Sequence, residues 1–170
     1  MRDAKSVIEQ LEERRLMSAG APDSTFGNGG QTITDYNGAV DDGHVLAVQS
    51  TGETVVLAGK DAAFHLIRYD THGNLESGFD VSPSVTRPRA MIVQGDDKIV
   101  VLGTEIGANG TVDMAVERFN ADGTPDTAFG TRKVDFTDPV GGESGDETGW
   151  GLAMDGSNII VAGTTNFGGS

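Results

Sequence analysis

The chain has 170 residues, enough for one ordinary domain with a hydrophobic core. Its 26 acidic and 12 basic residues give a formal net charge of -14, which argues against nucleic-acid binding because phosphates need basic patches. The chain has no cysteine, which excludes disulfides and thiolate chemistry, and none of its apolar runs approaches the about 18 residues of a membrane span. Its 25 glycines among short apolar runs favour many strands joined by turns.

Residues 1–20 differ from the rest of the chain because they carry its one strong helix signal. Ser6 and Glu9 have the spacing of a capping box, and Gly20 is placed to end the helix. We therefore expect a short N-terminal helix, separate from the segment 21–170.

The run IEQLEERRLMSA at residues 8–19 resembles the N-terminal LEPR/LEDR-LLS export segment of planctomycete-type surface proteins, with Met17 where that family has leucine. The resemblance implies an exported protein, extracellular or at the cell surface, and leaves open whether the segment is cleaved after residues 18–19. An amphipathic helix without a sorting role is the alternative.

The remaining chain contains an internal repeat. RYDTHGNLESGFD at residues 68–80 matches RFNADGTPDTAFG at residues 118–130, an offset of 50 residues without a gap, and PDSTFG at residues 22–27 repeats the end of the same unit. A second marker recurs as TVVLAG, KIVVLG and NIIVAG, which begin at residues 54, 98 and 158. Similarity at a fixed period of about 50 residues predicts a repeat architecture.

Each unit is expected to form several short strands. In chain order, the expected strands are residues 32–35, 44–49, 54–58 and 64–69, then 81–85, 90–94, 99–102 and 113–119, then 133–136, 151–154 and 159–162. The turns at 49–53 and 94–98 are expected to close hairpins.

The apolar runs 55–58 and 99–102 are continuous rather than alternating, so both faces of these strands should be buried. Propeller blades stack face to face and cover their middle strands in this way, and a four-stranded unit of about 50 residues has the size of a blade. A sandwich and a β-solenoid are the alternatives, but a sandwich leaves the repeat unexplained and a solenoid usually has a shorter period.

The repeated segments resemble the delta-60 repeats of a bacterial β-propeller family, whose pattern includes DGKIVVAG and RYNxDGxLDxxFG. The matching residues are DDKIVVLG at 96–103, with Asp97 where the pattern has glycine, and the two arginine-aromatic segments. The resemblance covers residues 22–170 and implies an all-β, propeller-like array of four-stranded blades. Its units are 22–79, 80–129 and a partial 130–170.

These units make fewer than three blades, whereas a closed propeller has about 4–8. We therefore expect the array to be incomplete, with further blades beyond Ser170. Open blade edges would invite self-association.

The recurring residues are expected to act in the scaffold. Three phenylalanines that precede turns should anchor those turns in the core, and two glycines should adopt positive φ. Two arginines that end apolar strands should pair with turn carboxylates. These residues are Phe26, Phe79 and Phe129; Gly73 and Gly123; and Arg68 and Arg118, with Glu76 and Asp126 as the expected carboxylates.

Motifs for catalysis are missing from the sequence: it has no GxSxG, GxxxxGK[ST] or HExxH. The histidines His44, His65 and His72 lack the close spacing of a zinc site, so we expect structural or surface roles for them. The longest insertion lies between residues 137 and 148 and is acidic. It offers four weak candidates for a calcium site, namely Asp138, Glu143, Asp146 and Glu147.

The sequence therefore favours a non-enzymatic, exported structural or binding scaffold without a cofactor, whose partner is an extracellular protein or glycan of unknown identity. One alternative is a propeller enzyme, lactonase-like or lyase-like, with an axial site completed by further blades; only the fold supports it. Another alternative is an adhesion module stabilised by calcium.

Overall fold

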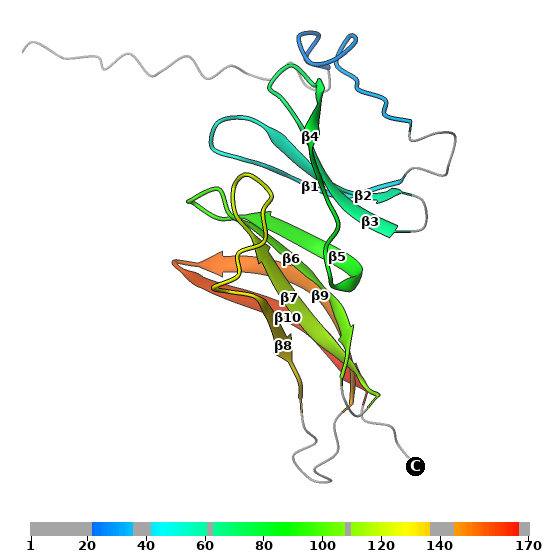
Figure 1. The fold of residues 1–170 in the computed structure, drawn as a ribbon, viewed down its shortest axis with the longest axis vertical. Helices are drawn as coiled ribbons and strands as arrows, with labels where there is room; N and C mark the ends of the chain where they lie inside the picture. Colours follow the sequence, from blue (N-terminus) through cyan, green and yellow to red (C-terminus); the bar gives the residue numbers. More distant parts are fainter. Residues whose placement is uncertain (1–21, 36–41, 61–62, 108–109, 137–144, 167–170) are drawn as a thin grey trace, which may run out of the picture.

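The computed structural model describes residues 22–35, 42–60, 63–107, 110–136 and 145–166. These residues form an all-β structure of two four-stranded antiparallel sheets and a two-stranded hairpin, as partial propeller blades would (Figure 1). Within these ranges there is no helix, and so none that could cross a membrane. The expected N-terminal helix and export segment lie outside the described residues.

The two sheets have the same simple order, each strand pairing with the next along the chain. The first sheet consists of β1 (Asp42–Val48), β2 (Thr54–Lys60), β3 (Ala63–Tyr69) and β4 (Leu75–Val81). The second consists of β5 (Thr86–Val93), β6 (Ile99–Ile106), β7 (Val112–Phe119) and β8 (Thr131–Val134). The hairpin consists of β9 (Asp146–Asp155) and β10 (Asn158–Asn166).

The expectation of burial on both faces is confirmed for the run in β6 but not for the whole run in β2, where Val56 is only partly buried and lines a surface pocket. In β6, six consecutive residues from Ile99 to Thr104 are buried. One face of the second sheet packs against the first sheet, and the other packs against the hairpin. The first of these two interfaces contains Val55, Leu57, Leu66, Ile99, Val101 and Ala115; the second contains Val100, Leu102, Val116, Leu152, Ile159 and Val161.

The first strands of the three units lie next to one another, because β5 contacts both β1 and β9. The hairpin is therefore stacked on the second sheet in the same way as the second sheet is stacked on the first. This arrangement of successive blades is the one that the repeat predicted.

Three expected strands are wrong; one of them, at residues 133–136 of the third unit, is replaced by β8, which is the fourth strand of the second sheet. Residues 32–35 form no strand; the Thr32 hydroxyl donates to the Gly73 backbone oxygen at 2.8 Å, and the Thr34 and Tyr69 hydroxyls lie 2.6 Å apart. Residues 82–85 form a link between sheets, and the fourth strand of the first sheet comes earlier, as β4.

Candidate functional site

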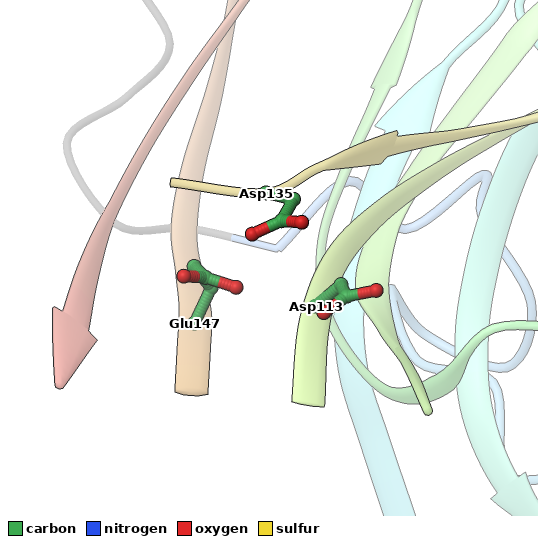
Figure 2. Close-up of side chains that lie close together, drawn as sticks. All are labelled: Asp113, Asp135 and Glu147. Carbon is green, nitrogen blue, oxygen red and sulfur yellow. The ribbon is translucent and has the colours of Figure 1, made fainter. Parts of the chain in front are cut away.

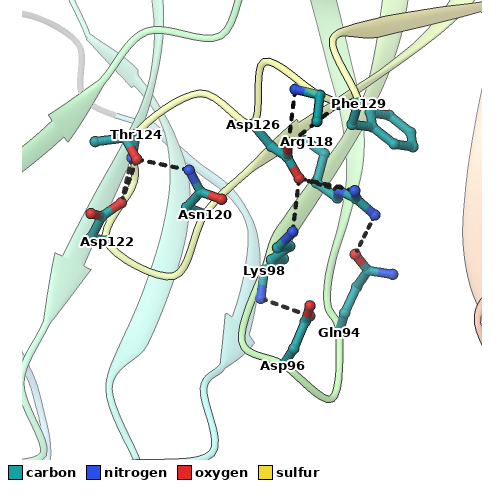
Figure 3. Close-up of polar contacts among 10 residues, drawn as sticks. Gln94, Asp96, Lys98, Arg118, Asn120, Asp122, Thr124, Asp126 and Phe129 are labelled. Carbon is teal, nitrogen blue, oxygen red and sulfur yellow. Dashed lines mark hydrogen bonds and ion pairs between the residues drawn. The ribbon is translucent and has the colours of Figure 1, made fainter.

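A cluster around Arg118 joins three segments of the second sheet (Figure 3). The Arg118 guanidinium donates to Asp126 at 2.9 Å and to the side-chain oxygen of Gln94 at 3.3 Å, and it lies 4.4 Å from the centre of the Phe129 ring. The Lys98 ammonium donates to the same carboxylate oxygen at 2.9 Å. This bond from Lys98, together with bonds from the Phe129 backbone and Arg118, lowers the pKa of Asp126 to about 2.

The first sheet repeats this arrangement with the equivalent residues. Arg68 donates to Glu76 at 2.7 Å and to Gln49 at 3.2 Å, and it lies 4.4 Å from the centre of the Phe79 ring. The two expected arginine-carboxylate pairs are therefore confirmed. We call each set of arginine, carboxylate, glutamine and phenylalanine an arginine cassette.

The cassette of the first sheet also reaches the second sheet. The backbone oxygen of Ala121 accepts hydrogen bonds from both Arg68 and Gln49, each 3.0 Å long. Beside them, the backbone amide and the hydroxyl of Ser50 donate to the Asp97 carboxylate at 2.6 and 2.5 Å, and these bonds lower its pKa. Asp97 has φ of 62°, in the left-handed region where the delta-60 pattern has glycine.

Two of the recurring phenylalanines, Phe26 and Phe79, each lie against the glycine of a turn later in the chain. A Cβ atom on Gly123, which has φ of 86°, would come within 2.8 Å of the Phe79 ring, and one on Gly73, with φ of 79°, within 3.0 Å of Phe26. The expectation of positive φ at both glycines is confirmed. Phe79 itself is buried in the interface between the two sheets.

A bulge interrupts the first strand of every unit. In β1 and in β9 one extra residue lies between consecutive pairs of the ladder; these residues are His44 and Trp150. In β5 the ladder passes from Thr86 to Ala90 while the partner strand advances only two residues, so Arg87, Pro88 and Arg89 bulge out. A proline fits such a bulge because it has no amide hydrogen to donate.

The bulged residues of the three strands meet in one groove of about 380 Å³, which we call the bulge groove. Its lining consists of His44, Val45, Phe64, Arg87, Pro88, Arg89 and Trp150. The Arg89 guanidinium lies 4.4 Å from the Trp150 ring centre, and the Trp150 indole donates to Thr164 at 3.2 Å. Arg87 has φ of 46°, a left-handed conformation that is costly for arginine.

The bulge groove can bind a ligand that has both negative charge and a flat or apolar face. Two exposed arginines offer fixed positive charge and hydrogen-bond donors, while the half-exposed Trp150 offers a stacking surface. The ligand-binding potential of these residues was not expected from the sequence. The available signal was the Arg-Pro-Arg run, together with the glycines next to His44 and Trp150, because proline and glycine inside strands often mark bulges.

A second polar cluster consists of the carboxylates of Asp113, Asp135 and Glu147 (Figure 2). They come from β7, from the segment after β8, and from β9, and one oxygen of each lies within 4.8 Å of the others. Asp113 and Glu147 are buried, and burial raises the pKa of Glu147. These carboxylate oxygens could hold a metal ion.

Of the four calcium candidates from the sequence, the structure describes two. Glu147 belongs to this carboxylate cluster, whereas the exposed Asp146 accepts a hydrogen bond from the Val112 amide at 2.9 Å. Asp138 and Glu143 lie outside the described residues. Asp113 and Asp135 were missed, because nothing local to either residue indicates that sheet stacking brings them to Glu147.

The histidines make local contacts. His65 Nδ1 lies 2.5 Å from Asp80 Oδ1, and the Ser82 hydroxyl lies 3.4 Å from the same nitrogen. A serine-histidine-aspartate relay needs the serine on one ring nitrogen and the aspartate on the other, so this trio lacks relay geometry. His44 lies 3.4 Å from Asp42 and packs edge-on against Phe64.

Residues 94–129 match the family model of a domain of unknown function (DUF5122) described as a β-propeller. Comparisons with curated proteins and with solved structures give no match. The matched residues run from Gln94 to Phe129 and so include the whole arginine cassette of the second sheet. The chain therefore contains a β-propeller repeat of a kind whose function is unknown.

Proposed function

We propose that this chain is a non-enzymatic, exported or cell-surface scaffold that binds an acidic extracellular partner, a glycan or a protein, in the bulge groove. The observation that carries the proposal is the coincidence of bulges in three successive first strands, which brings His44, the two arginines and Trp150 into one groove. Bulges re-aim side chains and are common beside functional sites.

The arginine cassettes support the scaffold part of the proposal. The residues that recur between units bind one another or the next sheet, as Arg68 and Gln49 do with Ala121. Recurring residues therefore stabilise the stack, and the residues that differ between units, such as those in the bulge groove, are left to bind a partner.

The charge of the bulge groove supports an acidic partner. Two exposed arginines lie together there in a chain whose formal net charge is -14. A carboxylate or sulfate can accept hydrogen bonds from a guanidinium, and a sugar ring or an aromatic side chain can stack on Trp150. An extracellular polysaccharide that carries uronic acids has both features.

Binding of the purified full chain to polygalacturonate and to neutral dextran would test the proposal, followed by capture experiments with extracellular matrix from the host. We expect salt-sensitive binding to the acidic polymer, weakened at least about tenfold by Arg89→Gln and by Trp150→Ala. The matched control is Arg132→Gln, since Arg132 lies over Phe129, outside the bulge groove. Absence of specific binding to either material, or an equal loss in the control, would contradict the proposal.

Export has a separate test. A reporter fused to residues 1–20 should leave the cytoplasm of the host, as the resemblance of residues 8–19 to export segments implies. Retention of the fused reporter would contradict this part of the proposal alone.

A further inference from the structure

We propose that Asp113, Asp135 and Glu147 form a calcium site that fastens the hairpin β9–β10 to the second sheet. The three residues come from both sides of that junction: Asp113 lies in β7 and Asp135 directly after β8 of the second sheet, and Glu147 lies in β9 of the hairpin. A cation bound among them would connect two blades at the end opposite the arginine cassettes.

The first argument is the state of Glu147. This side chain has no exposed surface. Its carboxylate interacts with the Phe136 backbone and, through Oε1, accepts a hydrogen bond from Thr165 at 2.9 Å, whereas the buried Oε2 atom has no hydrogen-bond partner within normal distance among the described residues. A buried carboxylate oxygen without a partner is costly, and a metal ion would supply the missing contact. Figure 2 shows the Glu147 carboxylate directed toward the other two.

The second argument is the balance of charge. Three carboxylates gather here, and the Lys133 ammonium lies 3.7 Å from Asp113 and 3.4 Å from Glu105, so its single charge is shared with a carboxylate outside the cluster. A divalent cation would add two positive charges among the three carboxylates.

The third argument is size and ligand type. Three oxygens no more than 4.8 Å apart can surround a point about 2.8 Å from each, and small rotations of the side chains would reach the 2.3–2.6 Å of calcium-oxygen bonds. Magnesium needs shorter bonds in a strict octahedron. Calcium accepts irregular sets of oxygens completed by water, so this open set of carboxylates fits calcium better.

Calorimetric titration of the metal-free full chain with calcium chloride would test the site, with magnesium chloride as the comparison. We expect calcium to bind at a stoichiometry near one. At a hundredfold excess over Kd, we expect calcium to raise Tm by about 5–10 °C relative to the chelated protein.

Glu147→Gln should abolish the calcium response. In chelator, the variant should have an unchanged or higher Tm, because the substitution removes a buried charge that is not fully compensated. If Glu147 had only a structural role, the variant would have a lower Tm in chelator than the wild type. The matched control is Asp146→Asn, next to it in β9, which keeps the oxygen that accepts from Val112 and should bind calcium like the wild type. Asp135→Asn should weaken calcium binding at least about tenfold. Because Asp135 is exposed, this variant tests the site without replacing a buried group.

Wild-type protein that binds no calcium would overturn the proposal. So would calcium binding that survives both Glu147→Gln and Asp135→Asn. Either result leaves the bulge groove unaffected, because the groove and the carboxylate cluster share no residue.

Discussion

The phenylalanine of each arginine cassette allows a direct comparison between a covered and an uncovered position. Phe79 is 3% exposed, lies under the Arg68 guanidinium and packs against Gly123 of the second sheet. Phe129 has the same 4.4 Å contact with its own arginine but is only partly buried. Replacing each by alanine therefore separates the contribution of the next blade's turn from that of the cassette itself.

We expect Phe79→Ala to lower the free energy of unfolding by about 4 kcal/mol. Truncation of a buried phenylalanine costs about 3–5 kcal/mol, within which the contact with arginine accounts for roughly 0.5–1 kcal/mol. Phe129→Ala should cost about half as much, since less apolar surface leaves the protein interior. The difference corresponds to a gap in Tm of roughly 4–8 °C.

Denaturation with guanidinium chloride, followed by circular dichroism, would measure both variants beside the wild type. Equal losses in the two variants would refute the inference that the cassette phenylalanine is fixed by the turn of the next sheet. A larger loss for Phe129→Ala would refute it more strongly.

Two further predictions concern a turn and a carboxylate. Gly110→Ala should lower the free energy of unfolding by about 1–2 kcal/mol, because φ is 86° at this residue. Gly123→Ala, at the same φ, should lower it by at least about 1 kcal/mol more, because the new Cβ atom would meet Phe79. Chemical denaturation would compare the two variants, and equal losses would refute the role of the Phe79 contact. The pKa of Asp126 is lowered from 3.8 to about 2, so its contribution to stability is complete above about pH 4 and is lost as the pH falls through about 2. The stability of the Asp126→Asn variant should therefore fall less steeply than that of the wild type between about pH 4 and about pH 2. The same acid dependence in both proteins would contradict the lowered pKa of Asp126.

The sequence predicted the parts of the fold that recur. Continuous apolar runs indicated strands covered on both faces, and the repeated arginine-aromatic segments indicated Arg68–Glu76 and Arg118–Asp126 pairs, because local spacing decides both features. The strand expected at 32–35 is absent; the segment contacts Gly73 and Tyr69 through the hydroxyls of Thr32 and Thr34, an outcome that strand propensity does not reveal.

The candidate sites were much less predictable. The carboxylate cluster joins Asp113, Asp135 and Glu147, whose proximity depends on how the hairpin stacks on the second sheet. The bulge groove depends on the register of three separate ladders, and a one-residue bulge leaves only a weak trace in the sequence. In both places the chemistry comes from stacking rather than from a local motif.

Hydrogen exchange on the full chain, measured strand by strand, tests the central claim that blades stack face to face on the second sheet. Exchange of backbone amides is slowest where burial and pairing are most complete. The account predicts that β6, covered on both faces, exchanges most slowly, and that β10, in which no residue is buried, exchanges much faster. Similar rates in β6 and β10, or fastest exchange in β6, would contradict the stacked arrangement.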